Sequence, residues 1–147
     1  MLKHIDARAT PELLYALARM GHGDEIALVD SNFPAYSTAS VRPVVELSGL
    51  TAPAAAELLL TLITLDVGSD PCSCMQAVGN PNQWEPVHHE VQRVIDGHED
   101  SKCRLKGIER FSGSVSAALV RSYARISKPS SAPLRPVASM LCQSLKS

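Results

Sequence analysis

The chain has 147 residues, the size of a single domain, and is long enough to bury a substantial hydrophobic core. Its 14 basic and 15 acidic residues leave a formal net charge of −1, which excludes strong electrostatic attraction to nucleic acid or to an anionic membrane. The longest apolar stretch, residues 54–65, contains Glu57 and is too short to cross a bilayer, and the N-terminus does not resemble a signal peptide. We therefore expect a cytoplasmic protein that contacts neither nucleic acid nor membrane.

The first predicted element is a helix over residues 9–20. Thr10 is its expected N-cap, and Pro11 occupies the first helical position, where a missing N–H is tolerated. Apolar residues recur on one face at helical spacing, namely Leu13, Leu14, Leu17 and Met20. Gly21 is expected to end the helix. His22 would then lie in the turn just beyond it, where the last carbonyl groups favour a protonated imidazole.

A short, fully buried strand is predicted over residues 26–30, because its first four residues are all apolar. Asp30 then stands at the C-terminal end of this strand, where open α/β sheets usually bind ligands. Two glycines flank His22 and leave its imidazole uncrowded by neighbouring side chains. His22 and Asp30 are therefore the first candidates for chemistry.

Strands and helices alternate in the middle of the chain. Residues 41–46 are predicted to be a strand, and Pro43 within it favours either an edge position or an interrupted strand. A helix follows over about residues 52–65 with Thr51 as its N-cap, and its apolar sequence predicts burial against a sheet or another subunit. A strand, an amphipathic helix and a further strand are then predicted over residues 72–78, 86–96 and 103–108.

The last 36 residues, 112–147, differ in composition from the rest of the chain. Ten of them are serine, five are basic, and no acidic residue follows Glu109. Residues 114–120 could begin a helix and residues 123–126 could form a strand, but the composition favours a flexible or poorly packed tail. We therefore expect a core α/β domain over residues 1–111 and a divergent, basic, serine-rich segment of the same domain over residues 112–147.

Three kinds of functional site lack their sequence signatures. His22 and the acidic residues near it could bind a metal, but no helical histidine pair or Cys/His cluster supports this. Neither Gly-x-Ser-x-Gly nor Gly-x-Gly-x-x-Gly occurs, which argues against a hydrolase triad and a dinucleotide site. General acid–base catalysis needs only a group that titrates near neutrality beside a carboxylate, and His22 and Asp30 could supply both.

Arg110 follows the strand predicted over residues 103–108 and adds a fixed cation with five donors. The carboxyl ends of parallel strands meet along one border of a sheet, so Arg110 could join Asp30 there. The alternative is purely structural: His22 would cap the helix before it, Asp30 would cap a turn, and Arg110 would pair with Glu109. Spacing alone leaves both interpretations open.

The four cysteines contain no CxxC pair; they are Cys72, Cys74, Cys103 and Cys142. Cys72 and Cys74 are two positions apart in a predicted strand, so they point to the same face and lie too close along it for an easy disulfide. We expect four reduced thiols, the usual state in the cytosol.

Four motifs carry a family resemblance: Pro11-Glu12-Leu13-Leu14, Met20-Gly21-His22-Gly23-Asp24-Glu25-Ile26, Asp30 with Asn32-Phe33-Pro34, and Ile108-Glu109-Arg110-Phe111. Through them the sequence resembles the L-fucose mutarotases, which are related to the ribose pyranases. The ribose-type relatives typically carry Gly-His-Thr-Asp, so Gly-His-Gly-Asp-Glu favours the fucose type. The match is most specific over residues 1–34 and extends to residue 111.

The resemblance implies a three-layer α/β/α fold with a central, largely parallel sheet, assembled as a homodecamer of two stacked pentameric rings with sites near subunit interfaces. It implies an isomerase that interconverts the α and β anomers of L-fucose, or a similar free monosaccharide, without a metal or cofactor. His22 matches the proton-transferring residue, and Asp30 and Arg110 match sugar-binding positions. The family's Phe-Tyr-Glu-Arg-like stretch and later Tyr-Gly-Asn do not occur after Phe111, so a non-catalytic sugar-binding or scaffold protein of the same fold is the alternative.

Overall fold

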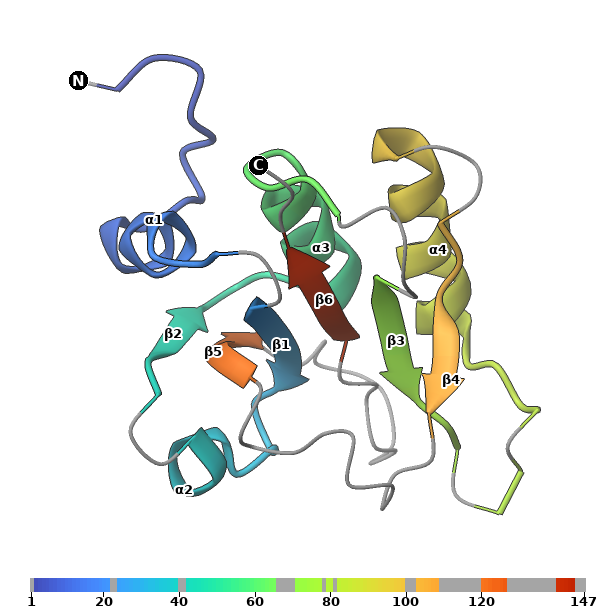
Figure 1. Ribbon diagram of the computed structural model, residues 1–147. Coiled ribbons are helices and arrows are strands. Elements are labelled where there is room, and N and C mark those ends of the chain that lie inside the picture. Colours follow the sequence, from blue (N-terminus) through green and yellow to red (C-terminus); the bar gives the residue numbers. More distant parts are fainter. Residues whose placement is uncertain are drawn as a thin grey trace.

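The computed structural model describes residues 2–21, 24–39, 42–65, 71–77, 79–80, 82–99, 103–108, 120–126 and 140–144, with residues 38–39 and the last two ranges described by their backbone alone. Within these ranges helices and strands alternate over most of the chain, and two strands close it (Figure 1). None of the described helices is both long and apolar enough to cross a membrane. The predicted α/β class is confirmed.

Six strands form one mixed sheet in the order β2-β5-β1-β6-β3-β4. The strands are β1 (Asp24–Asp30), β2 (Val44–Leu47), β3 (Cys72–Met75), β4 (Lys106–Ile108), β5 (Val120–Ile126) and β6 (Met140–Ser144). The pairings of β1 with β5, β2 with β5 and β3 with β4 are parallel, whereas β6 runs antiparallel to both β1 and β3. The other strands therefore run in one direction. We term the border where they end the carboxyl rim and the opposite border the amino rim.

The helices are α1 (Pro11–Ala18), α2 (Ala35–Ala39), α3 (Ala52–Leu60) and α4 (Pro86–His98). Both predicted threonine caps are confirmed. Thr10 Oγ1 accepts the Leu13 N–H at 3.1 Å, and Thr51 Oγ1 accepts the Ala54 N–H at 3.4 Å. α1 ends at Ala18 and not just before Gly21, and α3 also ends earlier than predicted, because 3₁₀-type hydrogen bonds tighten the last turns.

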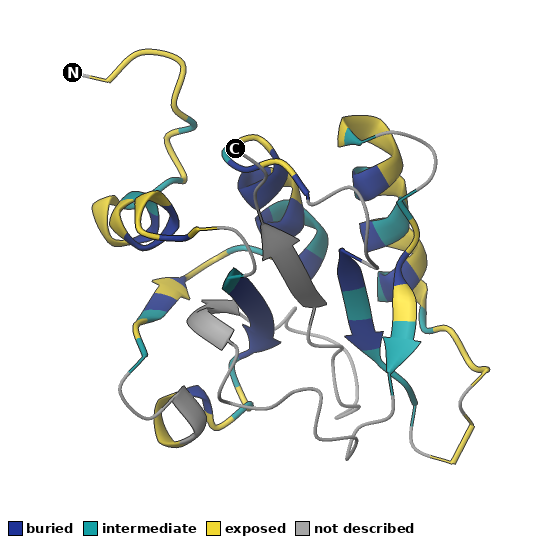
Figure 2. Ribbon diagram, in the orientation of Figure 1, coloured by how far each residue is buried: buried dark blue, intermediate teal, exposed yellow. Residues whose placement is uncertain are grey.

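Two apolar clusters lie on opposite faces of the sheet, because side chains alternate along a strand. The larger cluster joins α1, α3 and α4 to one face through residues such as Ile26 and Leu28 of β1. The smaller cluster contains Ala27 and Val29 of β1 together with Ala35 of α2. β1 is consequently buried on both of its faces (Figure 2).

The C-terminal strands β5 and β6 flank β1 in the middle of the sheet. In the backbone register, Ala27 lies opposite Tyr123 on one side and Leu141 on the other. The expectation of a flexible or poorly packed tail is therefore wrong for residues 120–126 and 140–144, whereas the predicted strand over residues 123–126 is confirmed. The composition is misleading because hydrogen-bonding neighbours specify a central strand as much as its own residues do. The helix expected over residues 114–120 falls outside the described residues except for Val120, which begins β5.

Candidate functional site

Asp30 is the one predicted site residue that the structure describes; His22 and Arg110 lie outside the described residues. Asp30 ends β1 at the carboxyl rim, as predicted, and only 8% of it is exposed. Its Oδ1 accepts the N–H groups of Asn32 at 2.7 Å and Phe33 at 2.9 Å. Asp30 thus caps the turn that follows β1, as the structural alternative predicted.

The second carboxylate oxygen of Asp30 makes this turn a candidate site. Oδ2 has no hydrogen-bond partner within the part of the chain that the structure describes. A carboxylate with one oxygen fixed by two backbone N–H groups is held in one orientation and presents the other oxygen to a ligand hydroxyl. The structural and functional roles of Asp30 are therefore compatible.

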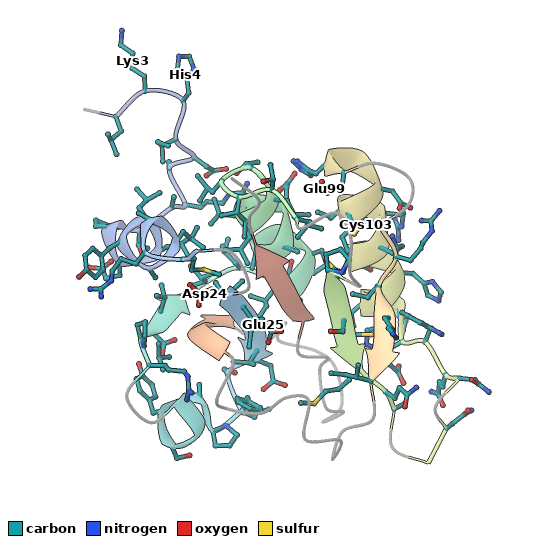
Figure 3. All side chains as sticks on the ribbon, in the orientation of Figure 1. Lys3, His4, Asp24, Glu25, Glu99 and Cys103 are labelled. Atoms are coloured by element: carbon teal, nitrogen blue, oxygen red, sulfur yellow. The ribbon has the colours of Figure 1, made fainter. Side chains whose placement is uncertain are left out.

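A second braced turn begins β1 at the amino rim. The Asp24 N–H donates to the Gly21 carbonyl at 3.0 Å, and Asp24 Oδ2 accepts the Gly21 N–H at 2.7 Å. Figure 3 shows Asp24 and the buried Glu25 at this end of the strand. Two hydrogen bonds therefore join Gly21 and Asp24, the described residues that flank His22 in the sequence.

The two ends of β1 are far apart within one chain. At about 3.3 Å per residue, the seven-residue strand from Asp24 to Asp30 spans about 20 Å. The strand before Arg110, β4, ends at the same rim as Asp30, but β6 and β3 separate it from β1, which corresponds to about 14 Å at the usual strand spacing. The Asp24 turn and Asp30 of one chain therefore do not reach the same monosaccharide.

His88 is a buried polar residue that the sequence reasoning missed. It is 4% exposed, lies in the first turn of α4, and accepts the Glu85 N–H at Nδ1 over 3.0 Å. Its Nε2 is buried without a hydrogen-bond partner in the described ranges. Burial outweighs the attraction of the Glu85 carboxylate and lowers the pKa of His88. The signal for this cap was the position of His88, three residues after Glu85 at the start of a helix with Pro86 in its first turn.

A small cavity beside His88 does not provide a sugar site. Its volume is about 10 Å³, room for about one water molecule. Apolar residues of β1, α3 and α4 line it together with Cys74 and His88. In the described ranges, no group of three His, Cys, Asp or Glu side chains comes together as a possible metal site.

Comparison with known proteins identifies related chains over most of the length. Residues 3–124 match the model of the RbsD / FucU transport protein family. The fucose mutarotase of Homo sapiens is 48% identical over 115 residues, covering 75% of this chain and 74% of that protein. An L-fucose mutarotase of Haemophilus influenzae is 35% identical over 112 residues, covering 76% of each. The crystal structure of FucU from Bifidobacterium longum has a TM-score of 0.81 at 26% identity and covers 97% of both chains.

The family match continues past Phe111 to residue 124, inside β5, and so extends further than the motifs read from the sequence. It includes the three predicted site positions His22, Asp30 and Arg110. The chain therefore belongs to the RbsD/FucU family, and its resemblance to the L-fucose mutarotases is confirmed.

Proposed function

We propose that this chain is an L-fucose mutarotase, an isomerase that interconverts the α and β anomers of L-fucose or a closely similar monosaccharide. The observation that carries the proposal is the 48% identity, over 75% of the chain, to the fucose mutarotase of Homo sapiens. The geometry at Asp30 supports it, because the buried carboxylate offers one fixed acceptor oxygen of the kind that orients a sugar hydroxyl.

Anomer interconversion requires only proton transfers. One proton leaves the anomeric hydroxyl, another is given to the ring oxygen, and the ring opens. Closure on the other face of the carbonyl group reverses both transfers. His22 is the proposed proton carrier, since an imidazole titrates near neutrality, while Asp30 and Arg110 are the proposed ligands of the sugar hydroxyl groups.

The site is proposed to form between two copies of the chain. Gly21, the residue before His22 in the sequence, is hydrogen-bonded to Asp24 at the amino rim, and Asp30 lies at the carboxyl rim about 20 Å from Asp24 along β1. If both residues contact one sugar, they come from neighbouring subunits. This separation supports a ring-forming homo-oligomer, for which we propose the homodecamer of three-layer α/β/α subunits that the family resemblance implies. A cytoplasmic location is proposed as well, in keeping with the free thiols of Cys74 and Cys103.

Saturation-transfer NMR on L-fucose tests the activity directly. We expect the two anomer signals to exchange faster with the protein than without it, and we expect His22→Ala to abolish this acceleration while sedimentation velocity shows an unchanged oligomer. Parallel measurements with D-ribose and D-galactose define the preferred sugar. No acceleration with any of the three sugars would refute the proposal.

A non-catalytic sugar-binding or scaffold protein is the second candidate. The observation that favours it is the absence of Tyr-Gly-Asn from residues 112–147. This alternative predicts that L-fucose raises the melting temperature of the protein without accelerating anomer exchange, so the two measurements together separate the candidates.

A further inference from the structure

Gln76 directly follows β3 at the carboxyl rim, the border of the sheet where Asp30 ends β1 (Figure 1). Its N–H donates to the Ile108 carbonyl at 2.9 Å, which continues the ladder between β3 and β4 by one residue. Its side chain lies against the backbone of Gly107, where a Cβ atom would be only 3.0 Å from Gln76 Cγ and 3.2 Å from Nε2. The absence of a side chain at Gly107 therefore leaves the space that the Gln76 side chain occupies.

The side-chain amide of Gln76 has no hydrogen-bond partner among the described residues. It carries two N–H donors and one acceptor oxygen, and the side chain is half-buried. The contact with Gly107 holds the side chain in place without using any of these polar groups. The amide is therefore available to a ligand.

Gln76 and Asp30 lie in the same row across the sheet and on the same face. Met140 of β6 pairs with Leu28 of β1 and with Cys74 of β3, so these three positions form one row of the backbone. The side chains of Leu28 and Cys74 both belong to the larger apolar cluster. Asp30 and Gln76 each follow two residues later, and because side chains alternate along a strand, both point to the face of this cluster.

The separation of the two side chains suits a single monosaccharide. β6 lies between β1 and β3, so two strand spacings, about 10 Å, separate Asp30 from Gln76. β6 begins at Met140, so no described residue of this strand lies between them in their row. With a hydrogen bond of about 2.8 Å from each side chain, about 4 Å remains between the two bound oxygens, which two hydroxyl groups of one pyranose ring can span.

We propose that Gln76 is a further sugar-binding residue, an inference that rests on the proposed mutarotase function. Its amide binds one hydroxyl group of the monosaccharide, while another hydroxyl group of the same sugar donates to Asp30 Oδ2. A hydroxyl group both donates and accepts, so it can satisfy an amide as well as a carboxylate. Because the amide neither gains nor loses a proton near neutral pH, Gln76 contributes to the affinity for the sugar and not to the proton transfers.

Gln76→Met separates sugar binding from packing. Methionine has the same chain length and keeps the contact with Gly107, but its side chain cannot donate a hydrogen bond. We expect KM for L-fucose, measured by NMR exchange, to rise about three- to tenfold while kcat is unchanged. Gln83→Met is the matched control and should leave KM unchanged, because Gln83 is exposed and its amide already donates to Glu85 at 2.9 Å.

Monodeoxy derivatives of L-fucose identify the hydroxyl group that Gln76 binds. Removal of that hydroxyl group should raise KM for the unsubstituted protein but have little further effect on Gln76→Met, because the hydrogen bond is already lost. If Gln76 only packs against Gly107, each deoxy sugar should change KM equally in both proteins. That result would overturn the proposal.

The dissociation constant for L-fucose, measured by equilibrium dialysis, keeps this inference distinct from the proposed function. Weaker binding by Gln76→Met supports the assignment even if the protein does not accelerate anomer exchange. Accelerated exchange with the same KM in both proteins overturns the assignment of Gln76 and leaves the mutarotase activity in place. Failure of the unsubstituted protein to bind L-fucose, D-ribose or D-galactose overturns both. If circular dichroism shows that Gln76→Met does not fold, Gln76→Ala, which is too short to clash with Gly107, takes its place.

Discussion

Asp24 and Asp30 stand at opposite ends of one strand and brace the turns there in a similar way. Each carboxylate accepts a backbone N–H at 2.7 Å, from Gly21 in one case and from Asn32 in the other. Asp24, however, is half-buried, whereas Asp30 is only 8% exposed and keeps one oxygen without a partner among the described residues. A shared capping role therefore does not make two residues equivalent. Burial and a spare acceptor oxygen distinguish the one suited to hold a ligand.

The largest expected effect is that of Asp30→Asn on anomer exchange. The amide keeps an acceptor oxygen for the turn but lacks the charge that strengthens a hydrogen bond to a sugar hydroxyl, a difference of about 1–2 kcal/mol. We expect kcat/KM for L-fucose, measured by NMR exchange, to fall about tenfold or more while the melting temperature changes little. Asp24→Asn is the matched control and should lower kcat/KM by less than about threefold. Equal losses in the two variants would contradict the distinction between the two ends of β1.

A third capped turn, the one before α4, extends the comparison to an imidazole. His88 Nδ1 accepts the Glu85 N–H only when the ring is neutral, and burial lowers the pKa of His88 in the folded protein from its ordinary value of 6.5. The stability that this neutral cap contributes is therefore complete above pH 6.5 and is lost as the pH falls from 6.5 towards the folded pKa. Over this pH range, the titration of His88 lowers the free energy of unfolding by at most about 1.4 kcal/mol per pH unit.

Urea unfolding at pH 7 and at lower pH measures this loss. Trp84, the single tryptophan, meets the His88 ring edge-on with the ring centroids 5.5 Å apart, so its fluorescence reports on the cap. His88→Gln should flatten the pH dependence below pH 6.5, whereas His89→Gln should retain it. If the unfolding free energy of His88→Gln depends on pH as steeply as that of the unsubstituted protein, another titratable group causes the loss of stability.

The smallest expected effect is that of Asp24→Ala, and it concerns a different kinetic quantity. The substitution removes the brace between Asp24 and Gly21, worth about 0.5–1.5 kcal/mol, and should lower the melting temperature by a few degrees. Because this turn joins the residues that flank His22, the proposed proton carrier, in the sequence and holds no proposed sugar ligand, we expect a few-fold lower kcat with an unchanged KM. A raised KM at unchanged kcat would instead place Asp24 among the sugar ligands.

The sequence predicts best the features that depend on a few neighbouring residues. The caps Thr10 and Thr51 and the edge position of β2 are of this kind, and all three are confirmed. The sequence does not predict α2 or β6. α2 has only five residues, and β6 contains no β-branched residue and takes its place through pairing with β1 and β3, which are distant in the chain.

The candidate site could be predicted residue by residue but not as a geometry. The apolar run before Asp30 and the glycines around His22 identify both positions from the sequence. The turn at Asp24 and the turn at Asp30 are close in sequence but not in space, because an extended strand places its ends nearly as far apart as the chain allows, about 20 Å here. A joint site of His22, Asp30 and Arg110 stays a prediction, and its formation between two subunits is our proposal.

The central position of the C-terminal strands has a consequence for biosynthesis. Of the five strand pairings in the described residues, four involve β5 or β6. β1 leaves the ribosome early, yet both of its hydrogen-bonding neighbours begin at Val120 or later. An apolar strand must therefore wait unpaired until residues 120–144 have been translated, which favours late folding and dependence on chaperones. A nonsense codon shortly before residue 120 would remove the partners of β1 and β2 and not a dispensable tail.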